Sequence, residues 1–461
     1  MTMKDVAIRL STSIVQFELS SQRFLCNNDK CNLLNSSDFL TVEFITYLPM
    51  KKNRLDDRND LPEEAISSYK IVIIGGGTGG CSLSHWCHKL VPKGQVAVID
   101  SADEHHYQPG YTFVGGGLCK LQQCIKPMKE VLHPDNAWIK KAAQKINPKE
   151  NSITLNDGTT ISYELLIVAA GLEVRFDLVK NLPEALSDSY VCSIYRADLA
   201  RKTQECLYAF NKGRAIFTLP NAPIKCSGAA QKICYLADEI FRKRGIREQV
   251  HITYNTFLPD VFDVPKYAKA LNEIIRKKSI ELKLLRNLKS INISEREATF
   301  ELTGKDNRPT GELEIQKFDF LHVAPPCSAP LVLRNSPEIT SANGFLDVNQ
   351  KSLQHIKFTN IFGIGDCIGF YVVRCTVLPI HFQYNCYSSC PVIVSFRHVV
   401  LAEFTPEGPF ETLPFNQAKP RYISFLLTRY VLPFIYWKLG VKGYWLGPSM
   451  IRKILHLGIS K

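Results

Sequence analysis

The sequence lacks several features that would place it in a special class of protein. It has no long block of Lys and Arg, although its net charge is +12. A basic stripe or patch is the usual sign of nucleic-acid binding, so we expect no nucleic-acid partner. Residues 1–68 contain no apolar run as long as a signal peptide or membrane anchor requires. With 45% hydrophobic and 22% charged residues, the chain has the composition of a folded globular protein.

The cysteines show no regular disulfide spacing. There are 15 of them, but a chain of 461 residues is far above the size that needs disulfides, and we expect most to be reduced. The pairs Cys26/Cys31 and Cys119/Cys124 are each separated by four residues. Zinc sites use tighter pairs with a matching second half, so we predict no metal site.

Alternating strand and helix patterns divide the chain into two similar units. Apolar, β-branched runs predict strands at 69–74, 96–99 and 165–168, with a helix at 79–90. A second unit has predicted strands at 215–219, 250–254, 282–284, 298–302 and 320–323, and helices at 197–210, 228–244 and 266–278. A strand at 361–364 returns to the first unit. We therefore predict an α/β fold with two Rossmann-like, doubly wound domains.

The predicted domain organisation follows from this order. Residues 1–68 form an N-terminal extension or leader, which is only mildly like a transit peptide and strongly acidic over 55–64. The first domain occupies 69–190, the second 191–330, and the first resumes at 331–400. Residues 401–461 form a C-terminal region.

The six residues 75–80, Gly-Gly-Gly-Thr-Gly-Gly, fit the dinucleotide-binding pattern G-x-G-x-x-G. Gly75 permits the tight turn, Gly77 lets the backbone approach a pyrophosphate, and Gly80 lets helix and strand pack closely. The helix N-terminus offers N–H groups to the phosphates. Asp100 follows twenty residues after Gly80, where a ribose hydroxyl needs an acceptor. A purely structural glycine turn is the alternative.

A second stretch, Phe-Gly-Ile-Gly-Asp at 362–366, resembles the second FAD-binding segment of flavoproteins with two dinucleotide domains. In that resemblance Asp366 approaches the ribityl chain and the phosphates. A carboxylate that caps the start of a helix is the alternative interpretation.

The second unit has no glycine motif after its first strand. The loop at 220–229 reads Pro-Asn-Ala-Pro-Ile-Lys-Cys-Ser-Gly-Ala, and its prolines remove N–H donors that a pyrophosphate would need. NAD(P)H is therefore not the expected electron donor. Cys226 stands at the turn before a helix, where the helix field favours thiolate; a buried structural Cys is the alternative. Cys390 precedes a proline in an expected extended turn, and its residue pattern alone favours a structural role.

The C-terminal region has the character of a membrane-surface segment. From 421 to 461 there are seven Lys and Arg residues and no acidic residue. An aromatic, apolar stretch at 425–437 is broken by Pro433 and is too short for a confident membrane span. We expect a pair of basic amphipathic helices in the bilayer interface, with a C-terminal pair of core helices as the alternative.

Several of these segments together resemble the sulfide:quinone oxidoreductases, most closely those of animal mitochondria. The resemblance rests on the stretches 220–232, 107–115, 363–367 and 389–391 and on the tail from 401 to 459, and it covers most of the chain. It implies that the chain has FAD as its cofactor and hydrogen sulfide and ubiquinone as substrates. It also implies a transit peptide and a peripheral, monotopic position on the mitochondrial inner membrane.

The resemblance further implies a site and a mechanism. Cys226 and Cys390 would share a disulfide or a sulfur bridge beside the flavin, and sulfide would attack one of the two sulfurs to give a persulfide. A small acceptor, glutathione or sulfite, would remove the sulfane sulfur. Attack on a disulfide is faster when the leaving thiol has a low pKa. The residues expected around FAD, besides the glycine loop, are Thr78, Gly79, Asp100, Gln108, Ala143 and Asp366.

The stretch 368–386 departs from this family pattern. Family members have a helix of small residues there, beneath the flavin, whereas this chain is shorter, apolar and β-like. Two alternatives to the sulfide:quinone oxidoreductase therefore stay open. One is a flavoprotein similar to a type II NADH:quinone dehydrogenase, which would need a nicotinamide loop. The other is a non-catalytic isoform that has lost flavin binding.

Overall fold

The computed structural model describes residues 68–369, 387–445 and 447–456. Its first parallel sheet is built around β1 (Ser68–Ile74), which pairs with β2 (Val96–Ile99) on one side and β8 (Thr160–Val168) on the other. β5 (Ala137–Ile139) extends the sheet beyond β2, and β19 (Ile361–Gly363) pairs in parallel with β8. The return of the chain to this sheet after 330 is the connection predicted from the sequence.

Helical and hairpin elements complete this unit. α2 (Thr78–Cys87) is the crossover between β1 and β2 and packs on both strands. β6 (Ala143–Asn147) and β7 (Ser152–Leu155) form an antiparallel hairpin attached to β8. β1, β2 and most of β8 are buried, as expected for parallel strands covered on both faces, and this explains their continuous apolar runs.

The second parallel sheet has the strand order β10-β17-β11-β12-β13. These strands are β10 (Val191–Cys192), β17 (Phe320–Val323), β11 (Gly213–Leu219), β12 (Val250–Thr256) and β13 (Glu281–Lys283). The helices α6 (Ala197–Ala209), α7 (Gly228–Lys243) and α8 (Pro265–Lys277) occur in this unit, and nearly all of α7 is buried. An antiparallel sheet follows, with β14 (Arg286–Asn292), β15 (Glu297–Thr303) and β16 (Pro309–Lys317).

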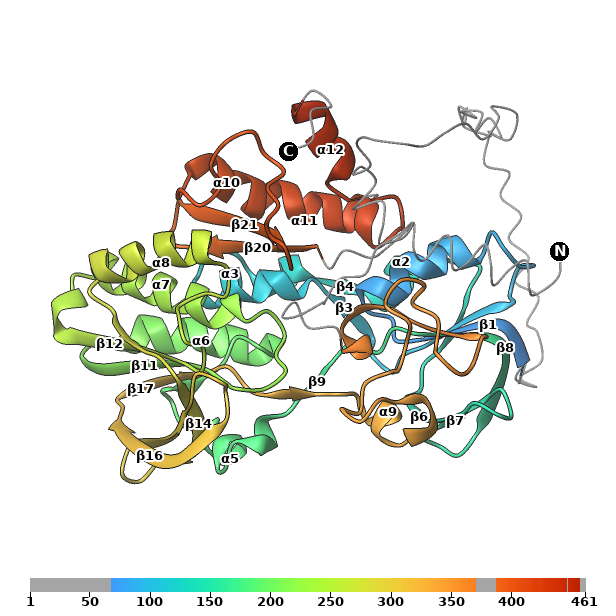
Figure 1. The fold of residues 1–461 in the computed structure, drawn as a ribbon, viewed down its shortest axis with the longest axis horizontal. Helices are drawn as coiled ribbons and strands as arrows, with labels where there is room; N and C mark the ends of the chain where they lie inside the picture. Colours follow the sequence, from blue (N-terminus) through green and yellow to red (C-terminus); the bar gives the residue numbers. More distant parts are fainter. Residues whose placement is uncertain (1–67, 370–386, 446, 457–461) are drawn as a thin grey trace.

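The C-terminal elements lie together on one side of the molecule (red in Figure 1). β20 (Ser388–Ile393) pairs antiparallel with β21 (Val399–Thr405), which pairs with β22 (Gly408–Pro409). One helical segment follows from residue 422 to residue 440. It consists of α10 (Tyr422–Leu426), a π-helical stretch (Leu427–Val431), α11 (Leu432–Ile435) and a second π-helical stretch (Tyr436–Gly440). α12 (Ser449–Leu455) is separate.

This segment joins the two units. Tyr436 and Trp437 pack against the hydrophobic core around the first sheet and also against the core around the second sheet. Pro433 does not end the helix as expected; it lies within the continuous helical segment, just after the π-helical stretch Leu427–Val431. No helix within the described part of the chain is long and apolar enough to cross a bilayer.

The structure confirms the mixed α/β class and the two parallel sheets. The domain boundaries at 190, 330 and 400 stay predictions. The leader at 1–67, with Cys26 and Cys31, lies outside the described residues, and so does 370–386, which contains most of the stretch that departs from the family pattern.

Candidate active site

The glycine loop has the backbone geometry that its sequence predicts. Gly75 has φ +100°, a left-handed conformation that side chains rarely adopt. A Cβ on Gly80 would lie 1.8 Å from the carbonyl oxygen of Gly75, so helix and loop approach too closely for any side chain there. A Cβ on Gly77 would meet no atom within 4 Å. The loop is therefore packed on its inner side and open at Gly77.

The start of α2 is suited to an anion. Its N-cap residue, Gly77, provides no side-chain cap, and no acidic residue stands in the first turn. The free N–H groups and partial positive charge of a helix N-terminus favour phosphate. Asp100, directly after β2, accepts hydrogen bonds from the N–H groups of Gly76 (2.6 Å) and Ala102 (2.8 Å). Each carboxylate oxygen keeps lone-pair capacity for a further donor.

Two more of the predicted cofactor residues meet near the second unit. Asp366 lies in a short 3₁₀ turn (Gly365–Ile368) directly after β19. Asp366 is exposed, but desolvation by the protein atoms around it raises the pKa of its carboxyl, and the charge of Lys225 opposes this rise. The Nζ of Lys225 also lies 3.4 Å from Oε1 of Gln108. Lys225 thus contacts Gln108 directly and acts on Asp366 through its charge.

Ala143 is placed differently. It begins β6, whose hairpin with β7 is attached to β8. In this sheet β8 and β7 stand between β6 and β1, the strand that leads into the glycine loop. A role for Ala143 in cofactor binding stays a prediction.

Sequence reasoning missed a contact between the C-terminal segment and the glycine loop. The Tyr436 hydroxyl lies 2.8 Å from the Thr78 hydroxyl and 2.7 Å from Nε2 of His105. Nδ1 of His105 lies 2.9 Å from the carbonyl oxygen of Gly76. No sequence pattern predicts a contact between residues more than 300 positions apart. Only the folded structure shows that the C-terminal segment is hydrogen-bonded to the glycine loop.

The structure brings Cys226 and Cys390 together. Cys226 stands just before α7, and Cys390 lies within β20 rather than in the expected turn. β20 packs directly on α7, and both residues are free thiols that lie close enough to shift each other's pKa. A Cβ on Gly228 would lie 2.7 Å from the Cys390 sulfur, so a glycine there leaves room for the pair.

The backbone at Cys226 is unusual. Its φ is +52°, in the left-handed region, which is uncommon for a residue with a side chain. Such strain is held where the surrounding structure enforces it and is frequent at functional sites. The Cys226 side chain is accessible to solvent although protein atoms surround it closely enough to contribute a desolvation cost.

The electrostatic environment makes the two thiols unequal. A hydrogen bond from Cys390, the charge of Lys232 and the N–H of Ala229 lower the pKa of Cys226 to about 5, although desolvation opposes them. The hydrogen bond to Cys226 and burial raise the pKa of Cys390. These surroundings favour Cys226 over Cys390 as the thiolate of the pair. The start of α7 was the expected cause of the lowered pKa of Cys226. Cys390 and Lys232 lower it more than the N–H of Ala229 in this helix start does.

Lys232 is the functional residue that the sequence did not single out. It lies about one turn into α7, is only 8% exposed, and places Nζ 3.5 Å from the Cys226 sulfur. Burial lowers the pKa of Lys232, but the charges of the two thiols raise it by more, so it stays protonated. The available signal for this role in the sequence was that Lys232 follows the candidate Cys226 by six residues and lies in the predicted helix 228–244.

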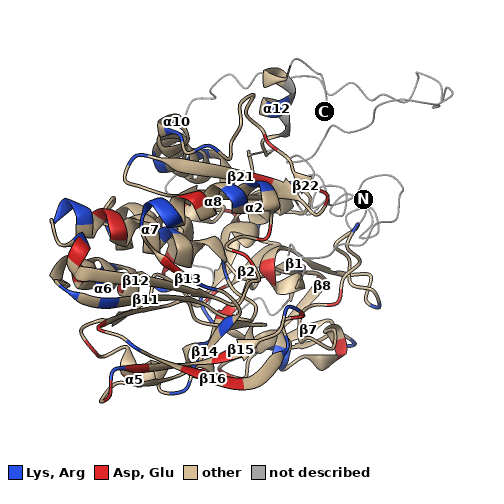
Figure 2. Cartoon of the chain, turned by 60° about the vertical axis from the view of Figure 1, so that its left-hand side comes forward, with Lys and Arg blue, Asp and Glu red and all other residues tan. Residues whose placement is uncertain are grey.

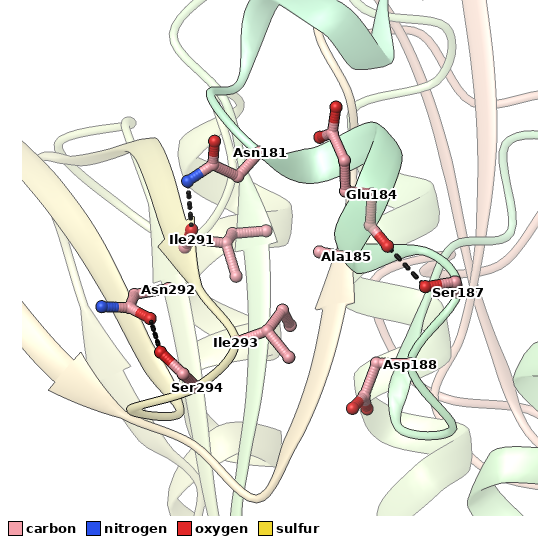
Figure 3. Close-up of a pocket in the computed structure, with 9 residues that line it drawn as sticks. All are labelled: Asn181, Glu184, Ala185, Ser187, Asp188, Ile291, Asn292, Ile293 and Ser294. Atoms are coloured by element: carbon pink, nitrogen blue, oxygen red, sulfur yellow. Dashed lines mark hydrogen bonds between the residues drawn. The ribbon is translucent and has the colours of Figure 1, made fainter.

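A second, separate depression does not belong to this site. It has a volume of about 420 Å³ and is formed by α5 (Leu182–Ala185), the residues after it and the end of β14. The residues that line it are labelled in Figure 3, and none of them is a predicted site residue. One of its polar groups, the side-chain amide of Asn181, donates a hydrogen bond to the carbonyl oxygen of Ile291. It contains no thiol and carries no functional assignment.

Comparisons with known proteins give one consistent result. The chain is 37% identical over 417 residues to a protein named sulfide:quinone oxidoreductase, mitochondrial, of Mus musculus, covering 86% of this chain and 91% of the relative. It is 35% identical over 404 residues to the protein of that name in Dictyostelium discoideum, with 83% and 88% covered. No family model matches the chain.

The fold agrees with a solved structure. The sulfide:quinone oxidoreductase of Aquifex aeolicus superposes with a TM-score of 0.67 at 19% identity, and 85% of this chain and 96% of that chain are covered.

Proposed function

Because the chain belongs to the sulfide:quinone oxidoreductase family, we propose that it oxidises hydrogen sulfide and passes two electrons through FAD to ubiquinone. The observation that carries the proposal is the contact between Cys226 and Cys390 beside the cation of Lys232. In sulfide oxidation through a persulfide, one cysteine carries the persulfide and the other leaves as thiolate. Two thiols of different pKa suit these two roles, because the thiol with the lower pKa leaves faster.

The residues present fit FAD. The loop is open at Gly77, the N-terminus of α2 is free of acidic residues in its first turn, and Asp100 follows β2. The glycine loop and α2 would hold the pyrophosphate, Asp100 the ribose, and Gln108 and Asp366 the remainder. The raised pKa of Asp366 suits a carboxyl that meets a hydroxyl-bearing chain. When bound, FAD supplies a two-electron acceptor that a quinone can reoxidise.

The difference in pKa between the two thiols decides which cysteine is attacked and which one leaves. In the disulfide form, HS⁻ attacks the sulfur of Cys390, the S–S bond breaks, and Cys226 leaves as thiolate with the electron pair. The low pKa of Cys226 makes it the better leaving group. Cys390 then carries the persulfide, and the Lys232 cation stabilises the thiolate of Cys226.

The cycle closes at the same two residues. A small acceptor, glutathione or sulfite, takes the outer sulfur from Cys390 and leaves a second thiolate. Forming the disulfide again from the two thiolates releases two electrons, which is the number that a quinone accepts. The sum is one sulfide oxidised to sulfane sulfur and one quinone reduced.

We also propose that the protein is mitochondrial and lies on the inner membrane through its C-terminal helices. Three large apolar side chains of the helical segment, Ile423, Tyr430 and Phe434, are 49%, 59% and 61% exposed. Together with the basic, acid-free composition of 421–461, this favours an interfacial position over a span. Relatives named as mitochondrial support the compartment.

A visible absorption spectrum of the purified, detergent-solubilised chain tests the proposal. We expect flavin bands that bleach when sulfide is added anaerobically and return when a ubiquinone analogue follows. Cys226→Ser and Cys390→Ser should each keep the flavin bands and lose the bleaching. Full activity in either variant would refute the two-cysteine mechanism, whereas a folded protein without flavin bands would support the non-catalytic isoform. Oxidation of NADH by the pure protein would favour the dehydrogenase alternative.

A further inference from the structure

A second pair of cysteines lies outside the site described above. Cys119 lies two residues before a single 3₁₀ turn, Leu121–Cys124, and Cys124 is its last residue. Their sulfurs are 3.9 Å apart, and both residues are free thiols. A disulfide bond is about 2.05 Å long, so the two sulfurs have to approach by about 1.9 Å to bond.

The two members of this pair have different surroundings. Cys119 is partly exposed, whereas Cys124 is 3% exposed. A Cβ on Gly110 would lie 2.3 Å from the Cys124 sulfur, which leaves no space for a group added to Cys124. Small molecules from solvent can therefore reach Cys119, and Cys124 is placed only to attack whatever is bonded to it.

The C-terminal segment supplies a cation to the same place. Arg429 donates hydrogen bonds from Nε and Nη2 to the carbonyl oxygen of Leu118, at 3.2 and 2.9 Å. The hydrogen bond from Cys124 and the charge of Arg429 lower the pKa of Cys119, although burial opposes them. An accessible thiol with a lowered pKa beside a buried partner is the usual arrangement of a reactive pair.

We propose that Cys119 and Cys124 form a second reactive thiol pair, which a low-molecular-weight persulfide oxidises to a disulfide. The proposal of a persulfide as the natural oxidant rests on the proposed function, because persulfide is the product that glutathione would carry away. The pair itself, with its geometry and accessibility, does not depend on that function.

The chemistry balances in two steps. The thiolate of Cys119 attacks the outer sulfur of R–S–S–H, forms a persulfide on Cys119 and releases R–S⁻. The thiol of Cys124 gives up its proton and attacks the Cys119 sulfur, and HS⁻ leaves with the electron pair. One persulfide and two thiols give one disulfide, one thiol R–S–H and one hydrogen sulfide. The sulfane sulfur is reduced and the two cysteines are oxidised.

Another close pair in the described part of the chain provides an internal control. Cys192 and Cys206 lie close enough to shift each other's pKa, but they are 0% and 4% exposed. Because a small oxidant reaches neither sulfur in the folded protein, we expect this pair to stay reduced under the same treatment. Accessibility, rather than proximity alone, then separates the two pairs.

The test uses the full chain with Cys226→Ser and Cys390→Ser, so that the first pair cannot react. The reduced protein is treated anaerobically with glutathione persulfide, blocked with iodoacetamide and digested with trypsin. Cleavage after Lys120 separates Cys119 from Cys124, so a disulfide holds the peptides 94–120 and 121–129 together. We expect this linked product in place of the two separate peptides, and its loss on reduction.

Matched variants make the result specific. Cys124→Ser should leave Cys119 carrying an extra sulfur and give no linked peptides, because the second attack is missing. Cys119→Ser should leave Cys124 unmodified. Persulfide treatment that never links the two peptides, or that links Cys192 and Cys206 to the same extent, would overturn the inference.

The two proposals fail separately. If the wild-type chain does not reduce quinone with sulfide but the peptides become linked, the proposed function is wrong and the second pair stands. If the wild-type chain is active and the peptides stay separate, the function stands and the second pair is refuted.

Discussion

Replacing Lys232 with Met should raise the pKa of Cys226, and it should raise the pKa of Cys390 as well, because the Lys232 cation lowers both. The substitution keeps most of the length of the buried side chain and removes the cation whose Nζ lies 3.5 Å from the Cys226 sulfur. A hydrogen bond to a charged group contributes about 1.5 to 3 kcal/mol, and 1.36 kcal/mol corresponds to a change of one in pKa. We therefore expect the pKa of Cys226 to rise from about 5 by about 1 to 2.

The sign and the pH range follow from the lowered pKa. Wild-type Cys226 is a thiolate above about pH 5, and removal of the cation moves that boundary upward. Near pH 6 the thiolate fraction should fall by about two- to tenfold in the variant, whereas well above neutral pH the two proteins should be alike. The rate of alkylation of reduced Cys226 by iodoacetamide, followed by peptide mass across the acidic and neutral range, measures this fraction.

Two matched variants separate this effect from a general loss of charge. Lys225→Met removes a cation one residue away from Cys226, but its Nζ contacts Gln108 and it is not among the groups that shift the pKa of Cys226. It should leave the alkylation profile unchanged. Lys232→Arg should restore most of the shift. Coincident profiles for wild type and Lys232→Met would refute the reasoning, because the cation would then do nothing at the sulfur.

Three further predictions concern the glycine loop and the tail that fastens it. Gly80→Ala puts a Cβ 1.8 Å from the carbonyl oxygen of Gly75 and should cost about 3 kcal/mol in the free energy of unfolding, measured with urea; a stable variant would mean that the helix can shift. In Gly77→Ala the new Cβ meets no atom within 4 Å, so the free energy of unfolding should change by less than about 0.5 kcal/mol. FAD should nevertheless be released more readily, measured by flavin fluorescence after dilution. Unchanged retention of FAD would argue against a pyrophosphate at this loop. Tyr436→Phe loses the hydroxyl that bonds Thr78 and should weaken docking of the tail by about 1 to 2 kcal/mol, seen as faster proteolysis after the aromatic residues of the segment; equal cleavage rates would show that apolar packing alone holds it.

The basic and acidic side chains mix over most of the described surface. α7 and α8 each carry both basic and acidic residues (Figure 2), and one carboxylate, Asp238, is buried with Arg242, Arg247 and Lys278 around it. The net charge of the chain is +12, and residues 421–461, with seven Lys and Arg and no acidic residue, contribute +7 of it. The excess positive charge is therefore concentrated in the C-terminal region, although it forms no continuous Lys/Arg block there.

The sequence by itself determined the parallel strands, because both faces of such strands are buried and the requirement appears as a continuous apolar run. The predicted strands at 69–74, 96–99 and 320–323 correspond to β1, β2 and β17 within one residue. It also determined the glycine loop, since a positive φ at Gly75 and a close approach at Gly80 admit no other residue type without strain. Local chemistry was sufficient in both cases.

Half-exposed strands were not visible in the sequence. β16 is mostly exposed and β6 is only partly buried, so neither carries a continuous apolar run. β20 contains Pro391 and was expected as a turn. What makes these segments strands is their pairing with neighbours in the sheet, which is a property of the assembled fold.

Only the tertiary structure decided which residues work together. Cys226 and Cys390 are 164 positions apart, and their sulfurs meet because β20 packs on α7. The same packing encloses Lys232, and burial beside two thiols turns an ordinary helix lysine into the cation of the site. The sequence could suggest that Cys226 is a thiolate from the helix that follows it. How acidic it is, and which partner and cation make it so, depends on distances that the fold alone sets.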